Sequence, residues 1–205
     1  MPRDGTATRT RILDAAESLM ERNGVAGTSV DQILAAAKTS KGAFFHHFDS
    51  KRELTAVLME RYVEADLGLL RAGLADVEDI EDPVERALGF ARYYERWAVE
   101  LVHEDSACLY IAALSERDLL EGPVRDAVLR AITTWRDEVA AVLAPALAAR
   151  ATQVRDLPDA HELADHLFAT FEGGYLLCRS LRSPEPMRAQ LRVFRQLLEA
   201  LLAER

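Results

Sequence analysis

The stretch from Thr28 to Leu54 constrains the fold more than any other part of the sequence, because it predicts two short helices joined by a tight turn. Apolar side chains in its first segment recur at helical spacing and share one face: Val30, Ile33, Leu34 and Ala37. Ser40 is a suitable cap for the second segment, which runs over residues 41–47 and begins with small or polar residues. Two short helices around a tight turn are typical of a helix-turn-helix.

The ends of these helices carry residues that favour capping. Thr28 or Ser29 can cap the first short helix. Ser50 and Glu53 have the spacing of a capping box, which predicts a third, longer helix from Ser50 to about Asp76. Because this helix continues from the helix-turn-helix into the rest of the chain, we expect it to link the two mechanically.

The remaining sequence also predicts helices, so we expect an all-α fold. An amphipathic helix from about Thr8 to Asn23 precedes the helix-turn-helix, and Gly24 is suited to the left-handed conformation that ends it. Alternation of apolar and polar residues, the signal of a strand, is weak throughout. We therefore expect a three-helix head over residues 1–50 and a second helical domain over residues 51–205.

Charge is distributed unevenly between these two parts. The net charge is −9, yet residues 1–61 carry nine Lys/Arg and eight Asp/Glu, whereas residues 62–205 carry 16 and 26. All three lysines lie in or beside the helix-turn-helix: Lys38, Lys41 and Lys51. Because phosphate repels an acidic surface, we expect the protein to meet double-stranded DNA through its head alone.

The basic N-terminus allows two interpretations. Arg3, Arg9 and Arg11 precede or open the first helix. They form either a frayed polar terminus or an arm that contacts phosphate or enters a minor groove.

The stretch resembles the N-terminal domain of TetR-type transcriptional regulators. The resemblance lies in T-S-V-D-Q-I followed by A-A, then in S-K-G-A-F-F-H-H-F and S-K-R-E-L, and it covers roughly the first 55 residues. It implies DNA contact at the positions that match the family motif: Thr28, Ser40, Lys41, His46 and Lys51. The rest of the chain is similar to the family in length and helicity.

Two residues depart from the family pattern. Lys38 stands in the turn where the family usually has Gly, and a lysine in a left-handed turn costs roughly 1 kcal/mol relative to Gly. Phe45 stands where the family usually has Tyr, and it lacks the hydroxyl that would donate to a phosphate. We expect Phe45 to contribute by packing only.

The residue types also favour a DNA-contacting surface. The amides of a capped helix start can meet a phosphate, and Lys41 can reach guanine acceptors in a major groove. Gly42 and Ala43 keep the second helix slim, and Lys51 can pair with phosphate. The alternative for each is a solvated surface group. The candidate DNA-contacting residues are Thr28, Ser29, Thr39, Ser40, Lys41, Gly42, Ala43, Phe45, His46 and Lys51.

Aromatic residues are dense in the second domain, with four of them in residues 90–97. They form either ordinary core or the wall of an apolar cavity, because ligand pockets are lined by aromatic side chains with a few polar tips. The family resemblance implies a small-molecule effector. The candidate effector-contacting residues are Tyr94, Trp97, Cys108, Trp135, Phe171 and Tyr175.

The last two helices are broadly apolar, running from Asp159 to about Leu181 and from Ser183 to the end of the chain. They form either intramolecular core or, with a symmetry mate, a four-helix bundle, which the family resemblance implies is a dimer interface. Gly173-Gly174 predicts close approach by a partner backbone or space for a ligand.

Other classes of function lack a sequence signal. No GxSxG, P-loop, dinucleotide fingerprint or zinc-ligand spacing occurs, and adjacent His46 and His47 point about 100° apart on a helix, so we expect no enzyme, metal site or cofactor. Cys108 and Cys178 are expected to be reduced core residues. The chain lacks a long apolar run and an apolar signal-peptide core, so we expect a cytoplasmic protein without a membrane span.

The predicted function is a homodimeric repressor that a largely apolar effector releases from a palindromic operator. The alternatives are a helical ligand-binding or scaffold protein and an enzyme without a recognisable motif.

Overall fold

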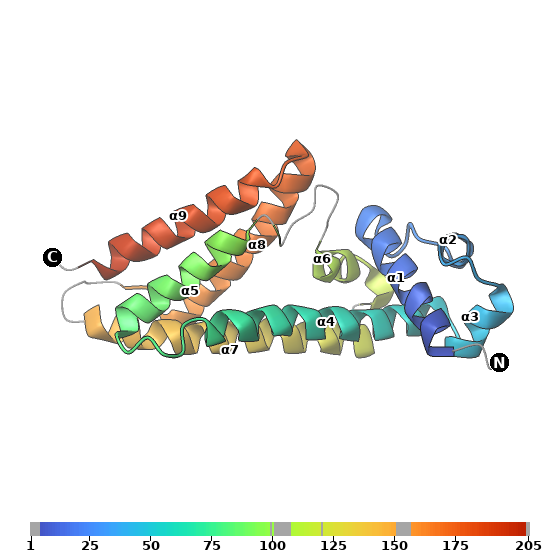
Figure 1. Cartoon of the computed structure of the whole chain (residues 1–205), viewed down its shortest axis with the longest axis horizontal. Helices are drawn as coiled ribbons and strands as arrows, with labels where there is room; N and C mark the ends of the chain where they lie inside the picture. Colours follow the sequence, from blue (N-terminus) through green and yellow to red (C-terminus); the bar gives the residue numbers. More distant parts are fainter. Residues whose placement is uncertain (1–4, 99, 101–107, 120, 151–156, 204–205) are drawn as a thin grey trace. The chain divides into compact units, whose positions relative to one another are not determined.

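The computed structural model describes residues 5–98, 100, 108–119, 121–150 and 157–203. Within these ranges the regular structure is helical and contains no strand, which confirms the all-α prediction. The helices are α1 Gly5–Asn23, α2 Val30–Ala36, α3 Lys41–His47, α4 Lys51–Ala75, α5 Pro83–Trp97, α6 Leu109–Leu114, the 3-10 helix η1 Arg117–Leu119, α7 Pro123–Arg150, α8 Ala160–Leu181 and α9 Glu185–Leu202 (Figure 1).

The chain divides into two compact units. Unit 1 comprises Met1–Ala65 and Ala107–Arg130, and unit 2 comprises Asp66–Ser106 and Ala131–Arg205. Helices α4 and α7 each contribute residues to both units. The domain boundary expected between residues 50 and 51 stays a prediction.

Unit 1 is built around the three N-terminal helices and the start of α4. The apolar stripe of α1 is buried as predicted, together with one anchoring side chain from α2 and two aromatic rings at α3: Ile12, Leu13, Ala16, Met20, Ile33, Phe44 and Phe48. Arg61 on α4 pairs with two carboxylates of α1, those of Asp14 and Glu17. This ion pair fixes α4 to α1 at the edge of the apolar core.

The predicted helix ends are largely confirmed. Gly24 ends α1 with φ +74°, and its N–H donates to Met20 O at 2.9 Å. At α4 the capping box forms only one of its two expected bonds: Glu53 N–H donates to Ser50 Oγ at 3.1 Å. The Glu53 carboxylate instead accepts the N–H of Asp49, at 2.6 Å, one residue earlier than expected.

In unit 2, α9 packs against both α5 and α8, which lie along it in Figure 1. Asp82 caps α5 by accepting the Glu85 N–H at 2.8 Å, and Asp159 and Glu162 form both bonds of a capping box at α8. Helix α5 ends at Trp97, and residues 99 and 101–107 beyond it lie outside the described residues.

The tandem glycines of α8 differ in their surroundings. A Cβ at Gly174 would lie 2.6 Å from Met187 Sδ of α9, whereas a Cβ at Gly173 would meet no atom within 4 Å. The close approach is thus found at Gly174 alone, and the Met187 side chain of α9 in the same chain makes it rather than a backbone. As for the membrane, none of the described helices combines the length and apolarity that crossing it requires.

Candidate nucleic-acid interface

The start of α3 presents a small, polar and basic surface over a buried aromatic anchor. Ser40 caps the helix, because its Oγ accepts the Ala43 N–H at 3.2 Å. Lys41 and Gly42 are exposed and Ala43 is half-buried, so little side-chain bulk covers this end of the helix. Phe44 on the opposite face is completely buried and holds the helix against the core. The arrangement leaves backbone and short side chains free to approach a groove.

The two rings that follow extend this surface. Phe45 is 47% exposed, packs edge-on against Phe44 with 5.2 Å between ring centroids, and lies 6.0 Å from Lys41 Nζ. The expectation that Phe45 contributes by packing stays a prediction, and nearly half of the residue is exposed to solvent. His46 is exposed too, whereas His47 is half-buried.

The start of α2 resolves the choice between two candidate caps. Ser29 is the cap: its Oγ accepts the Gln32 N–H at 3.2 Å, and Gln32 Oε1 accepts the Ser29 N–H at 2.7 Å. Thr28 is completely buried, and its hydroxyl donates to Gly24 O at 2.8 Å. The expectation of a DNA contact through the Thr28 side chain does not fit this burial, because its hydroxyl holds the loop that precedes α2.

The turn between α2 and α3 has the conformation that its sequence predicts. Lys38 has φ +51°, in the left-handed region where glycine is favoured. Thr39 is half-buried, and its N–H donates to Leu34 O at 3.1 Å. The lysine side chain is exposed, and Lys38 borders a groove that residues of α1 and the end of α2 also line.

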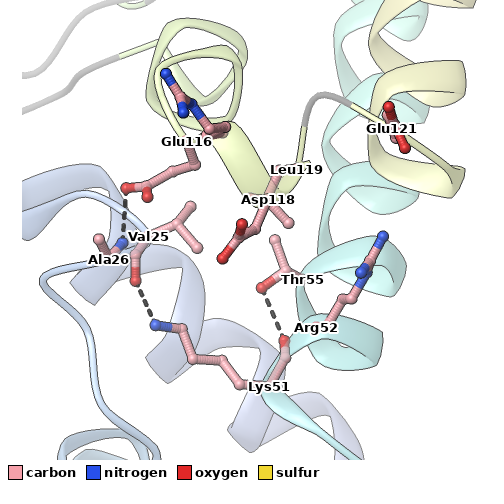
Figure 2. A pocket seen from close by; sticks show the side chains of 10 residues that line it. Val25, Ala26, Lys51, Arg52, Thr55, Glu116, Asp118, Leu119 and Glu121 are labelled. Carbon is pink, nitrogen blue, oxygen red and sulfur yellow. Dashed lines mark hydrogen bonds between the residues drawn. The ribbon is translucent and has the colours of Figure 1, made fainter.

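Lys51 lies at the first turn of α4, and its side chain forms a hydrogen bond within the protein. Its Nζ donates to Val25 O at 2.6 Å, and the side chain is half-buried. On the other side of the same peptide group, the Ala26 N–H donates to Glu116 Oε1 at 2.9 Å (Figure 2). The sequence prediction of a phosphate contact at Lys51 did not include this bond, and Glu116 was not identified at all. No sequence signal links Glu116 to a loop 90 residues earlier.

These residues border a polar pocket of about 620 Å³ within unit 1. Its lining comes from the loop after α1, the first turns of α4, the segment around η1 and the residue before Gly122: Val25, Ala26, Lys51, Arg52, Thr55, Glu116, Arg117, Asp118, Leu119 and Glu121 (Figure 2). The pocket contains cations and carboxylates in equal number, so its lining has no net charge.

Two of the basic residues near the N-terminus, Arg9 and Arg11, are part of a helix. Helix α1 begins at Gly5, three residues before the predicted start, and includes Arg9 and Arg11. The guanidinium of Arg9 lies 5.4 Å from the Phe48 ring centroid, and Arg11 donates to Thr8 Oγ1 at 3.2 Å. Arg3 lies outside the described residues.

Three of the candidate effector residues meet in unit 2. The Tyr94 ring lies 5.5 Å from both the Trp135 ring and the Phe171 ring, and the last two are 6.0 Å apart. Trp135 Nε1 donates to Asp66 at 2.8 Å, and the Tyr94 hydroxyl donates to Leu69 O at 3.3 Å. Burial raises the pKa of Tyr94, so this hydroxyl remains a neutral donor.

The other three candidate effector residues lie differently. Trp97 is 47% exposed and contacts Tyr93, with 6.4 Å between ring centroids. Cys108 is buried in unit 1, and Tyr175 is half-buried in unit 2. Tyr94, Trp135 and Phe171 thus form an aromatic trio in which Phe171 is half-buried. Tyr93 links Trp97 to this trio, because its ring centroid also lies 5.2 Å from that of Tyr94.

Helices α8 and α9 carry apolar side chains that unit 2 does not cover. The most exposed are Leu176 at 67%, Leu181 at 65% and Leu197 at 56%. An apolar groove of about 230 Å³ lies between the same two helices and is lined by Leu163, His166, Phe194, Leu197, Leu198 and Leu201. Isolated exposed leucines are common, but several on one helix pair make that pair a candidate interaction surface.

Candidate metal ligands do not gather in the part of the chain that the structure describes. No group of three or more His, Cys, Asp or Glu side chains is arranged there to hold a metal ion.

Comparisons with known proteins match both parts of the chain. The profile described as "Bacterial regulatory proteins, tetR family" matches residues 12–58, and that described as "Tetracyclin repressor-like, C-terminal domain" matches residues 83–194. The HTH-type transcriptional repressor SCO4008 of Streptomyces coelicolor is 34% identical over 88 residues, which are 43% of this chain and 44% of that protein.

Two further similarities extend over nearly the whole chain. The HTH-type transcriptional repressor DhaR of a Mycobacterium species is 28% identical over 198 residues, covering 96% of this chain and 93% of that protein. The crystal structure of a regulatory protein TetR from Rhodobacter sphaeroides has a TM-score of 0.73 at 24% identity, over 91% of this chain and 96% of that one. The second similarity extends the agreement in fold to both units.

Proposed function

Because this chain belongs to the tetR family of bacterial regulatory proteins, we propose that it acts as a homodimeric transcriptional repressor whose α3 reads an operator. The chain is a DNA-binding transcriptional regulator with a helix-turn-helix. Repression, the dimer and the effector are the proposed parts. The single observation that carries the operator contact is the exposed start of α3, where Ser40, Lys41 and Gly42 lie over the buried Phe44.

The proposed docking follows from the chemistry of this surface. Lys41 donates to guanine acceptors in the major groove, while the slim start of α3 lets its backbone approach the bases. The exposed ring of Phe45 adds apolar contact, since thymine methyl groups are apolar. Ser29, Thr39 and His46 lie on the same two helices or their turn and are proposed to position the head on the phosphates.

A dimer is proposed through the exposed leucines of α8 and α9. Two heads on one operator double the bases that are read, and a palindromic operator matches the two-fold symmetry of such a dimer. Leu176→Glu or Leu181→Glu would place a charge on this surface, and we expect each variant to sediment as a monomer where the unmodified protein sediments as a dimer.

Release of the operator is proposed to follow effector binding beside the aromatic trio of Tyr94, Trp135 and Phe171. Aromatic rings with a few polar tips suit a largely apolar molecule. Such a molecule weakens DNA binding only if it prefers the state that does not bind DNA, typically by about 1–3 kcal/mol. Operator DNA lies in the bacterial cytoplasm, so the protein is proposed to act there.

The decisive experiment measures binding to a DNA duplex that the protein selects from a random-sequence pool. Lys41→Ala is expected to weaken binding by about 1–3 kcal/mol and to relax specificity at one base pair. Arg92→Ala on α5 is the control, because it removes the same charge from an exposed surface pair with Glu85. Failure to select any duplex would overturn the proposal in favour of a helical binding protein or an enzyme.

A further inference from the structure

We infer that Glu116 and Lys51 are positioning residues for DNA binding, because together they hold the peptide group from which the helix-turn-helix begins. This inference rests on the proposed docking of α3 and adds the contacts that orient the helix-turn-helix for it. The two side chains and the Val25–Ala26 peptide are called the peptide clamp below (Figure 2).

The clamp holds both polar atoms of one peptide group. Lys51 Nζ donates to the carbonyl oxygen of Val25 at 2.6 Å, and the N–H of Ala26 donates to Glu116 Oε1 at 2.9 Å. The Val25 oxygen also accepts the Thr28 N–H at 3.2 Å. A peptide group is planar and rigid, so fixing its oxygen and its nitrogen fixes its orientation.

The loop that contains this peptide has little freedom to reorient without the clamp breaking. It begins at Gly24, with φ +74°, and a Cβ at Gly27 would lie 2.3 Å from Asn23 O. The Val25 side chain is buried, and Thr28 is buried directly before the cap Ser29. The peptide clamp therefore ends at Ala26, four residues before α2 begins, and determines how that helix leaves the loop.

Both side chains of the clamp come from well-anchored backbone. The Glu116 N–H donates to Ala113 O at 3.1 Å, and its carbonyl oxygen accepts the Leu119 N–H at 2.9 Å. Lys51 belongs to the first turn of α4, where its carbonyl oxygen accepts the Thr55 hydroxyl at 2.8 Å. Because the anchors belong to α4 and to the segment between α6 and η1, these elements set the position of α2 and α3.

Charged partners make each bond of the clamp stronger than a bond between neutral groups. A hydrogen bond to an ionised side chain is shorter and roughly twice as strong as a neutral one. Loss of one partner frees the peptide to rotate, so the head spends less time in the orientation that fits the groove. The consequence is weaker operator binding without loss of the folded head.

The test compares three variants on the duplex that the unmodified protein selects from a random pool. Glu116→Ala is expected to weaken binding about tenfold, since one charged hydrogen bond is lost. Glu116→Gln keeps an oxygen that accepts the Ala26 N–H and is expected to recover most of the affinity. Asp118→Ala is the control, because Asp118 lines the same pocket and bonds to no described residue, and it is expected to change affinity less than about twofold.

Amide hydrogen exchange separates positioning from general destabilisation. Glu116→Ala should speed exchange at Ala26 and over residues 26–29, while the amides of α1 and the melting temperature stay as in the unmodified protein. Unchanged operator affinity in Glu116→Ala, or an equal loss in Asp118→Ala, would overturn the inference. Failure of the proposed docking has a different signature, namely full affinity in Lys41→Ala.

Salt dependence distinguishes the clamp from a phosphate contact at Lys51. Lys51→Met keeps the length of the side chain and removes the donor. If Lys51 acts through the clamp, the variant binds more weakly while the slope of log affinity against log salt stays the same. A fall of about one in that slope would mean that Lys51 contacts phosphate directly, and the clamp role of Lys51 would be rejected.

Discussion

The two short helices of the helix-turn-helix are held by contacts of different range. Helix α3 starts at a cap three residues from the amide that it accepts, and it is anchored by Phe44 within the helix. Helix α2 has a local cap too. The loop that leads into it, however, forms hydrogen bonds with Lys51 and with Glu116, which is 90 residues from Ala26. The recognition surface is thus specified locally, whereas its orientation depends on distant parts of unit 1.

The largest expected effect comes from removing the anchor of α3. Phe44→Ala should lower the free energy of unfolding by about 3–5 kcal/mol, because a completely buried ring leaves a cavity. Phe45→Ala is the matched control, since its ring is 47% exposed, and it should cost less than about 0.5 kcal/mol. Denaturant unfolding at a fixed protein concentration measures both. Equal losses of unfolding free energy in the two variants would mean that Phe44 is not the main anchor of α3.

A methyl group at Gly27 should disturb α2 and leave α3 in place. The added Cβ would lie 2.3 Å from Asn23 O, so the loop must shift, at a cost of about 1–3 kcal/mol of unfolding free energy. We also expect weaker operator binding, because the shift moves the peptide clamp. Thermal unfolding and the selected duplex provide the two measurements.

Gly42→Ala on α3 is the counterpart of this substitution. Its Cβ would meet no atom closer than Ser40 Oγ at 3.9 Å, and alanine favours a helix over glycine by up to about 1 kcal/mol. It should therefore not destabilise the protein. If Gly27→Ala is as stable as Gly42→Ala, the loop before α2 has room for a methyl group at Gly27.

The same contrast between short-range and long-range contacts explains which features could be predicted from the sequence. The cap at Ser40 follows from spacing within a few residues, and the structure has it. The left-handed turn at Lys38 is implied by the family resemblance, and the structure has it too. The choice of Ser29 over Thr28 did not follow, because both are good caps and burial of Thr28 depends on packing around the loop.

Contacts between distant segments could not be predicted from the sequence, and the reason is physical. Glu116 is one of many acidic residues in a helical chain, and its role depends on where η1 meets the loop after α1. In unit 2, the aromatic density predicted either core or cavity, and the sequence alone did not show that Tyr94, Trp135 and Phe171 contact one another while Cys108 belongs to unit 1.

Loss of either N-terminal cap is expected to have a smaller effect, which differs between α2 and α3. Ser40→Ala and Ser29→Ala should each cost about 1 kcal/mol of unfolding free energy, the usual value of a lost cap. Operator affinity should fall more in Ser40→Ala, because Gln32 and the peptide clamp still hold the start of α2. Ser18→Ala, an exposed site within α1, controls for loss of a hydroxyl and should change neither quantity appreciably. Equal losses of affinity in the two cap variants would argue against the difference between the helices.

The smallest effect is expected in the turn that joins the two helices, and it has the opposite sign. Lys38 has φ +51°, and a side chain in this region costs roughly 1 kcal/mol relative to glycine. Lys38→Gly should therefore raise the free energy of unfolding by up to about 1 kcal/mol, since it removes strain without removing a buried contact. The lysine is exposed beside the proposed operator surface, so we expect the more stable variant to bind the selected duplex less tightly.

Arg182 offers a matched control for this trade between stability and binding. It also has φ +51°, but it caps the C-terminal end of α8 in unit 2. Arg182→Gly should raise stability by a similar amount and leave operator affinity unchanged, because the acidic unit is not expected to meet DNA. If Lys38→Gly gains stability and keeps full affinity, the lysine contributes nothing to DNA binding, and its place in the turn has no explanation in the recognition surface.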